Sequence, residues 1–277
     1  MKKNFTKKLM AAAILLVTAV SPSWADYTIT KSNGDPAVAG TDRWAVDDGT
    51  DYVVESSCIY LKTSGLVLSG EINVAVYPYV DNCTLTLKDV TITSSYWAGA
   101  LCYQNNNELT LVLEGTNRLI CTSGGSAIRL YNSGTNITFT GSGELYMTSQ
   151  AINQEVGQSC LFIDLYTNKT GSATAEGFTI KGSTANAADI SSLTDAVIDT
   201  YEYSNSYGDK YKAVGILIGD AVCNTVWMKG PEAGPDLDPD TEYVVVTYKE
   251  GSDTKKAYYK TSDVEKIEWL KGEDITE

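Results

Sequence analysis

Apolar residues recur in pairs at a fixed interval between Cys58 and Tyr166. Each pair has the form apolar–x–apolar, and the pairs follow one another every 26 residues: Ile59/Leu61, Leu85/Leu87, Leu111/Leu113, Ile137/Phe139 and Ile163/Leu165. Apolar and polar residues alternate around them, as in Thr84–Lys88, so each segment has one inward and one outward face. A period in the range of roughly 20 to 50 residues is typical of a solenoid.

Strand-like alternation without helical spacing predicts an all-β chain folded as a right-handed parallel β-helix, a solenoid with coils of about 26 residues. Its strands would stack at about 4.8 Å. Gly115 and Gly141 each follow a strand, where we expect turns with positive φ. The expected buried ladder, one residue per coil, consists of Leu85, Leu111, Ile137 and Ile163.

Composition divides the chain into five parts. A basic start, the apolar run Met10–Val20 and the small–x–small site Ser23–Ala25 are typical of a cleaved signal peptide. Three prolines in Gly230–Pro239 indicate a linker, and the alternating segments after it predict a hairpin. The expected parts are residues 1–25, a signal peptide; 26–54, an N-terminal cap; 55–229, the parallel β-helix, with one or two irregular coils after residue 168 that continue through 213–218; 230–240, the linker; and 241–277, a small C-terminal β-hairpin module.

The leader predicts export to the periplasm, the cell surface or the medium. No cysteine directly follows the cleavage site to accept a lipid, so we do not expect a lipoprotein. No later segment reaches about 18 consecutive apolar residues, so we expect no transmembrane helix. Among the six cysteines, Cys58 and Cys83 adjoin strands of successive coils, and this position favours a disulfide between them.

The chain is acidic, with 35 Asp and Glu against 21 Lys and Arg and a formal net charge of −14. This balance argues against nucleic-acid binding, which needs clustered basic side chains. The acidity serves solubility or provides carboxylates for Ca²⁺. Asp81 and Asp89 are the candidate metal ligands, and we expect no cofactor other than calcium.

Missing residues restrict the chemistry. The chain has no histidine, which excludes Ser-His-Asp and Cys-His sites and His-ligated zinc. A polysaccharide lyase would need an Arg or Lys base beside carboxylate-bound Ca²⁺. The side chains that we considered for such a site are Arg118, Arg129, Asp81, Asp89, Glu114, Glu144 and Asp164. No carboxylate among them repeats with the 26-residue period, so we interpret them as solvated surface groups and expect no enzyme activity.

Aromatic residues precede several polar turns. Tyr79, Tyr103 and Tyr131 each lie six or eight residues before a repeat strand, so we expect them to form a ladder along one exposed edge. Exposed rings beside amide groups are suited to carbohydrate, because sugar faces stack on rings while hydroxyls bind polar neighbours. The alternative is that these tyrosines pack the solenoid turns. The candidate carbohydrate-binding residues are Tyr79, Tyr96, Trp97, Tyr103, Tyr131, Asn105 and Asn132.

Three segments carry a resemblance to a known family: Leu85–Ile92, Leu111–Leu119 with Ala127–Ile128, and Ile137–Leu145. They resemble the secreted carbohydrate-binding β-helix proteins that look like polysaccharide lyases without their activity. The resemblance implies binding of acidic or cellulose-like plant polysaccharide, sometimes with Ca²⁺. The last 30 or so residues, ending in Val264–Trp269, resemble a short C-terminal module of secreted proteins from Bacteroides-like bacteria.

Three functions fit these observations. The first is a noncatalytic protein that binds a polysaccharide or a cell-surface glycan. The second is a structural or adhesive β-helix at the cell surface. The third is a weak polysaccharide lyase.

Overall fold

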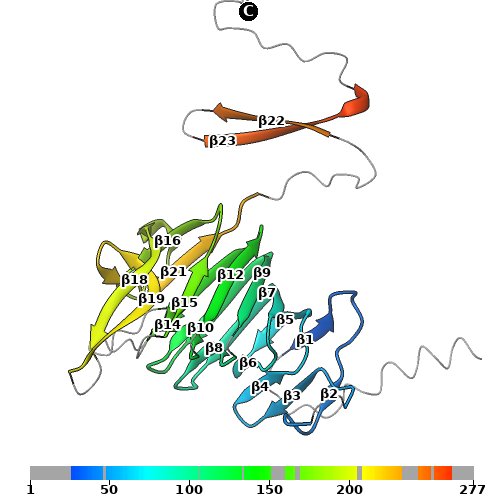
Figure 1. Cartoon of the computed structure of the whole chain (residues 1–277), viewed down its shortest axis with the longest axis vertical. Coiled ribbons are helices and arrows are strands. Elements are labelled where there is room, and N and C mark those ends of the chain that lie inside the picture. The colour runs from blue at the N-terminus through cyan, green and yellow to red at the C-terminus, as the bar shows by residue number, and fades with distance from the viewer. Residues whose placement is uncertain are drawn as a thin grey trace, which may run out of the picture. The chain divides into compact units, whose positions relative to one another are not determined.

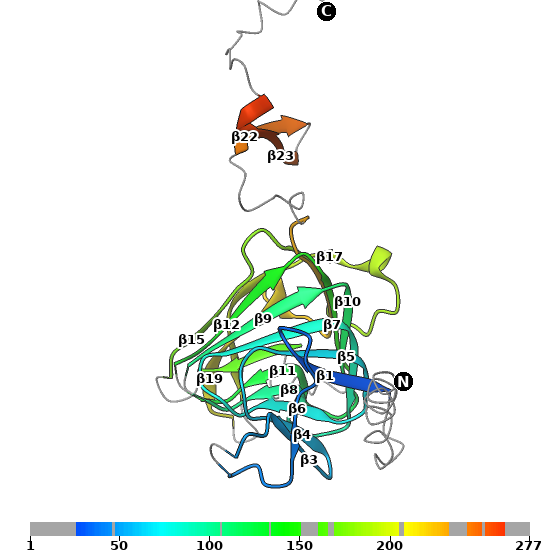
Figure 2. The same cartoon turned by 90° about the vertical axis from the view of Figure 1, so that its right-hand side faces the viewer.

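The computed structural model of the protein describes residues 26–45, 48–105, 107–132, 134–150, 160–165, 169–204, 208–232, 243–250 and 253–263. The predicted signal peptide lies outside these residues. Contacts divide the chain into two compact units with a boundary between Pro231 and Glu232. The first unit is all-β, and its sheets curl around a common interior (Figures 1 and 2).

In the first unit the chain passes repeatedly, in one order, through three rows of strands, which we call faces A, B and C. Face A contains the first halves of β5 (Leu66–Ile72) and β7 (Cys83–Ser94), then β9 (Glu108–Glu114), β12 (Thr135–Gly141) and β15 (Gly171–Thr174). Face B contains the second halves of β5 and β7, then β10 (Thr116–Cys121) and β13 (Glu144–Ser149). Face C contains β4 (Cys58–Leu61), β6 (Ala75–Pro78), β8 (Gly99–Tyr103), β11 (Ser126–Leu130) and β14 (Leu161–Asp164). These neighbours pair in parallel, so each circuit through the faces lies beside the previous one (Figure 1).

Alternate side chains of these strands point into an apolar interior. On face A the buried ladder consists of Leu66, Leu85, Leu111 and Phe139. The predicted ladder is therefore wrong in two members. Ile137 lies opposite Leu109, and Ile163 belongs to β14 on face C, although both are buried.

Circuit length explains this difference. Residues that lie opposite each other are 26 apart in sequence between β7 and β9, 28 apart between β9 and β12, and 27 apart between β8 and β11. An extension by two residues keeps inward side chains inward. The apolar pattern therefore predicts which side of a strand is buried, but it does not determine which residue lies opposite.

Between faces A and B the chain turns at residues with positive φ. The values are +83° at Gly70, +49° at Asp89, +64° at Gly115 and +89° at Gly141. The predictions for Gly115 and Gly141 are confirmed. A Cβ atom on Gly141 would lie 2.3 Å from the carbonyl oxygen of Leu113, so this turn needs glycine for space as well as for conformation.

Antiparallel strands pair with the first and last parallel strands, so the sheets are mixed. At the start of the unit, β1 (Tyr27–Lys31) pairs with β5, and β3 (Tyr52–Glu55) pairs with β4 and, in parallel, with β2 (Ala39–Gly40). After β13 come β21 (Thr225–Lys229), β16 (Thr179–Ser183) and β17 (Thr194–Asp195), and the 3₁₀ helix η3 (Ile190–Ser192) precedes β17. After β14 come β19 (Lys210–Ile218), β18 (Val197–Ser204) and β20 (Ala221–Val222). The expectation of further coils through 213–218 is wrong, because alternation does not distinguish a parallel from an antiparallel neighbour.

The cysteines are six buried free thiols. Cys58 lies in β4 on face C, whereas Cys83 lies in β7 on face A. The expected disulfide between them is therefore wrong. It assumed that both residues precede equivalent strands, but the first apolar pair of the repeat belongs to a different face from the second.

The second unit contains a hairpin of β22 (Tyr243–Glu250) and β23 (Asp253–Lys260), followed by the 3₁₀ helix η4 (Thr261–Asp263). The closing segment expected at 264–269 lies outside the described residues. Within the part of the chain that the structure describes, no helix has the length and apolar character needed to span a membrane.

We predict that Gly141→Ala lowers the free energy of unfolding, because the added methyl group meets the backbone of Leu113. The control is Gly219→Ala, where φ is +58° but no atom lies within 4 Å of the added Cβ. The control should lose about 1 to 2 kcal/mol from left-handed strain alone, and Gly141→Ala about 2 kcal/mol more. Urea unfolding followed by tryptophan fluorescence measures both losses. Equal losses would contradict the prediction.

Candidate functional site

The outer side of face C carries a row of large side chains. Across β4, β6, β8, β11 and β14 the row consists of Tyr60, Tyr77, Cys102, Arg129 and Phe162. Each follows an inward apolar residue, so strand alternation points it outward. Tyr60 and Tyr77 lie opposite each other, with ring centroids 5.5 Å apart.

Further rings extend this row into a line across the sheet, which we call the aromatic stripe. It consists, in spatial order, of Trp44, Tyr79, Tyr60, Tyr77, Tyr96, Trp97, Tyr131, Phe162 and Tyr203, with Tyr201 and Tyr211 beside Tyr203. Centroids of contacting rings are 5.5 to 6.4 Å apart. Between Tyr131 and Phe162 the guanidinium of Arg129 makes the connection, at 4.6 Å and 5.3 Å from their centroids.

The stripe has a closed floor and two raised rings. Tyr77, Phe162 and Tyr201 are at most 8% exposed, because neighbouring rings cover them. Trp44 and Trp97 are each 61% exposed. These two indoles therefore offer most of their apolar surface to solvent.

Short turns hold the two indoles. The amide of Trp44 donates a hydrogen bond to Oδ1 of Asp42 at 2.9 Å. Next to Trp97, the amide of Tyr96 donates to Oγ of Ser94 at 3.0 Å. Bonds from a side chain to the backbone two residues on fix turns of this kind, so both rings are positioned before any ligand arrives.

Two arginines lie among the rings, and they differ in their partners. Arg43 lies 4.6 Å from the ring centroids of both Trp44 and Tyr60 and forms an ion pair with Glu55 at 3.2 Å. Arg129 contacts three rings, but among the described residues no acidic side chain forms an ion pair with it, and its buried Nε has no hydrogen-bond partner there. Arg129 is thus available to bind oxygen atoms of a ligand.

Burial keeps the phenol and thiol groups of the stripe protonated. It raises the pKa of Tyr60 to about 12 and the pKa of Cys102 to about 12. Burial is also the largest cause of the raised pKa values of Tyr77 and Tyr131. The tyrosine hydroxyls therefore remain hydrogen-bond donors at neutral pH.

Four of the candidate carbohydrate-binding residues, Tyr79, Tyr96, Trp97 and Tyr131, lie in the stripe. Tyr103 does not, because its side chain is fully buried and its hydroxyl donates to the carbonyl oxygens of Val80 and Glu108. The expected ladder of Tyr79, Tyr103 and Tyr131 is therefore wrong. Tyr103 lies opposite Leu130, so Tyr131 is one residue beyond that pair and points to the other side of the sheet.

The polar candidates lie in turns. The carbonyl oxygens of Asn105 and Asn132 both accept a hydrogen bond from the hydroxyl of Thr135 at 2.8 Å, so these asparagines support the turn before β12. Asp89 occupies the corner between faces A and B, and Asp81 is exposed before β7. The described residues contain no group of three acidic or thiol side chains arranged to hold a metal ion.

Sequence reasoning missed much of the stripe. Tyr60 and Tyr77 are the outward residues between buried neighbours, a pattern visible in Cys58–Leu61 and Ala75–Pro78. Arg129 was considered only as a catalytic base. It lies on face C and Arg118 on face B, so the two arginines do not share a site.

No protein-family model, curated protein or solved structure matches this chain. Inference about its function therefore rests on the geometry of its own surface.

We predict that the free energy of unfolding falls as the pH rises above about 8.5. Unfolded thiols and phenols lose protons near pH 8.5 and 10. In the folded chain burial raises the pKa of Cys83 and Cys102 to about 12 each. The folded state thus holds more protons in this range, and each of these thiols lowers stability by up to about 2 kcal/mol at pH 10.

Urea titrations at neutral pH and at pH 10 measure this loss, and Cys102→Ala should reduce the difference between them. Equal stability at both pH values would contradict the prediction.

Proposed function

We propose that this protein is a noncatalytic carbohydrate-binding protein that holds a polysaccharide along the aromatic stripe. The observation that carries the proposal is the unbroken line of rings and arginines on face C, with two indoles that are 61% exposed. Apolar faces of sugar rings stack on aromatic side chains, and a few polar groups fix their orientation.

The length of the stripe favours a polymer over a single sugar. Its rings extend from β4 to β18 across six strand spacings, roughly 29 Å at about 4.8 Å each. Hydroxyl groups of tyrosines, the guanidinium of Arg129 and the carboxylate of Glu55 lie along this line as donors and acceptors. Neighbouring rings would hold adjacent sugars of one chain, which raises the affinity for long chains.

The finer fold and the location of the protein belong to the same proposal. Faces A, B and C with their circuits of 26 to 28 residues support a short right-handed parallel β-helix closed by antiparallel strands. The leader-like start supports export to the periplasm, the cell surface or the medium. Calcium remains part of the proposal as an aid to binding.

A structural or adhesive role is the second candidate. The buried floor of the stripe favours it, because Tyr77, Phe162 and Tyr201 already bury one another and stabilise the sheet without any ligand. The two exposed indoles would then contact another macromolecule.

We predict that Trp44→Ala and Trp97→Ala each weaken polysaccharide binding about 2- to 10-fold, the equivalent of about 0.5 to 1.5 kcal/mol per stacked ring. The double variant should lose more affinity for a long polysaccharide than for a disaccharide. A glycan array with and without Ca²⁺ selects the ligand, and calorimetry measures the affinities.

Thr86→Ala on the outer side of face A is the matched control and should bind like the parent. Thermal melting checks that the tryptophan variants are folded. Unchanged binding by the double variant, or binding of no glycan by the parent, would contradict the proposal and favour the structural role.

We predict no turnover of polygalacturonate or other uronic-acid polymers. The chain has no histidine, and Arg118 and Arg129 lie on different faces. Glu114 is paired with Lys88 at 3.1 Å, and Asp164 accepts a hydrogen bond from Tyr203 at 2.9 Å. Near-ultraviolet absorbance detects the unsaturated products of a lyase. Their accumulation by the parent, and its loss in Arg118→Ala or Arg129→Ala, would establish the activity that we exclude.

A further inference from the structure

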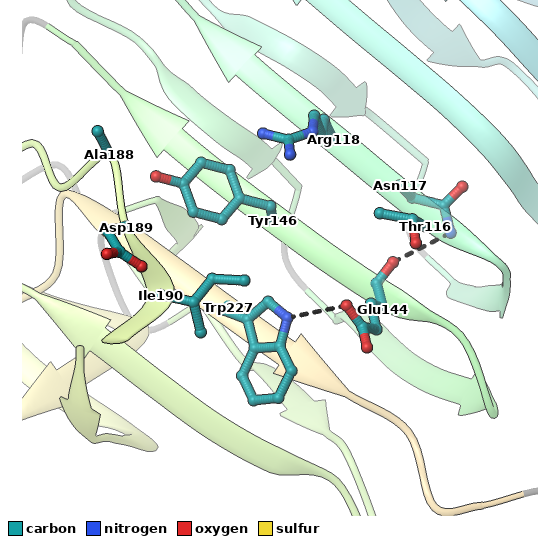
Figure 3. A pocket seen from close by; sticks show the side chains of 9 residues that line it. All are labelled: Thr116, Asn117, Arg118, Glu144, Tyr146, Ala188, Asp189, Ile190 and Trp227. Carbon is teal, nitrogen blue, oxygen red and sulfur yellow. Dashed lines mark hydrogen bonds between the residues drawn. The ribbon is translucent and has the colours of Figure 1, made fainter. Parts of the chain in front are cut away.

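A pocket of about 170 Å³ lies on the outer side of face B, away from the strands that carry the stripe (Figure 3). Its floor is part of a row of residues that lie opposite one another on neighbouring strands: Arg118 on β10, Tyr146 on β13 and Trp227 on β21. Figure 3 shows the two rings side by side, with the guanidinium of Arg118 beside Tyr146. The distance from that guanidinium to the Tyr146 centroid is 5.3 Å.

The loop between β16 and β17 forms one wall. The hydroxyl of Tyr146 donates a hydrogen bond to the carbonyl oxygen of Ala187, which fastens this loop to the floor. Asp189 and Ile190 follow and line the pocket. Asp189 caps η3 by accepting the amide of Ser191 at 2.9 Å, and Ile190 is 41% exposed beside Trp227.

The charges that line the pocket are balanced. Glu144 accepts a hydrogen bond from Nε1 of Trp227 at 3.3 Å and forms an ion pair with Lys229 at 3.5 Å. Asp189 adds a negative charge and Arg118 a positive one, and among the described residues no acidic side chain forms an ion pair with Arg118. An anion would meet Asp189 and Glu144, and a cation would meet Arg118. The lining therefore favours an uncharged ligand with many hydroxyl groups.

We propose that this pocket binds one neutral sugar ring, at a site distinct from the stripe. The inference rests on the proposed carbohydrate-binding function and adds a second site to it. The volume is below the roughly 300 to 1,000 Å³ of pockets that hold drug-sized ligands, so it suits one ring and not a chain. Trp227 and Ile190 provide apolar surface, the carboxylates of Asp189 and Glu144 accept from sugar hydroxyls, and Arg118 donates.

The test observes Trp227 directly. In the ¹⁵N-labelled full chain, the indole N–H signal of Trp227 is identified by its loss in Trp227→Phe. Glucose, galactose and N-acetylglucosamine are titrated separately, with glucuronate as the charged comparison. We expect a saturable shift of this signal with at least one neutral sugar in the millimolar range, and a weaker effect of glucuronate.

Two variants test the pocket, and two serve as controls. Asp189→Asn keeps a residue that caps a helix but removes the charge, so it should weaken binding of the neutral sugar about 5-fold or more while glucuronate binds better than in the parent. Ile190→Ala should weaken binding of both. Thr93→Ala, on face B outside the pocket, and Trp97→Ala, in the stripe, should leave the Trp227 titration unchanged.

The outcomes separate this inference from the proposed function. If polysaccharide binds through Trp44 and Trp97 while the Trp227 signal stays fixed with every sugar, the pocket inference fails and the stripe proposal stands. If a single sugar shifts Trp227 while no polysaccharide binds the stripe, the reverse holds. A stronger response to glucuronate than to all neutral sugars would overturn the assignment of a neutral ligand, and silence in both assays would overturn both proposals.

Discussion

The first unit depends on the corner between faces A and B, where each circuit must turn sharply and still lie in register with its neighbours. Gly115 and Gly141 provide the left-handed conformation, and the fully buried Asn117 connects three circuits. Its Oδ1 accepts the amide of Val90 at 3.1 Å, and its Nδ2 donates to the carbonyl oxygens of Glu114 and Glu144 at 3.0 Å and 3.1 Å. A buried amide with these partners satisfies backbone groups that no apolar side chain could satisfy.

Register at this corner determines what the outer surfaces can do. Inward positions are committed to the apolar interior, so variation in side-chain chemistry falls to the outward positions, which stack in rows at the spacing of the strands. Face C uses its row for rings and arginines. Face B places Arg118, Tyr146 and Trp227 in a similar row, but the third of these comes from an antiparallel strand. One scaffold thus presents a long apolar line on one face and a small enclosed site on another.

The antiparallel strands contribute to both function and stability. β1 and β3 cover the first parallel strands, and β21 and β19 cover the last ones, so the parallel strands do not end in exposed edges that would pair with another chain. The same closing strands carry Trp227 into the pocket and Tyr201, Tyr203 and Tyr211 into the stripe. Both proposed sites therefore depend on how the stack of circuits is closed.

The sequence by itself determined the properties that depend on neighbouring residues. Alternation predicted strands and their buried sides, glycine predicted the turns at 115 and 141, and the composition after residue 240 predicted the hairpin. Tertiary structure decided which strands pair. Circuits of 26, 27 and 28 residues moved Ile137 and Ile163 out of the expected ladder, and the strand that holds Tyr103 placed this ring inside. The aromatic stripe was hidden for the same reason, because its rings come from strands far apart in sequence. The physical reason is that side-chain period fixes the face of a strand, whereas its partner depends on turn lengths and on pairing energies between distant segments.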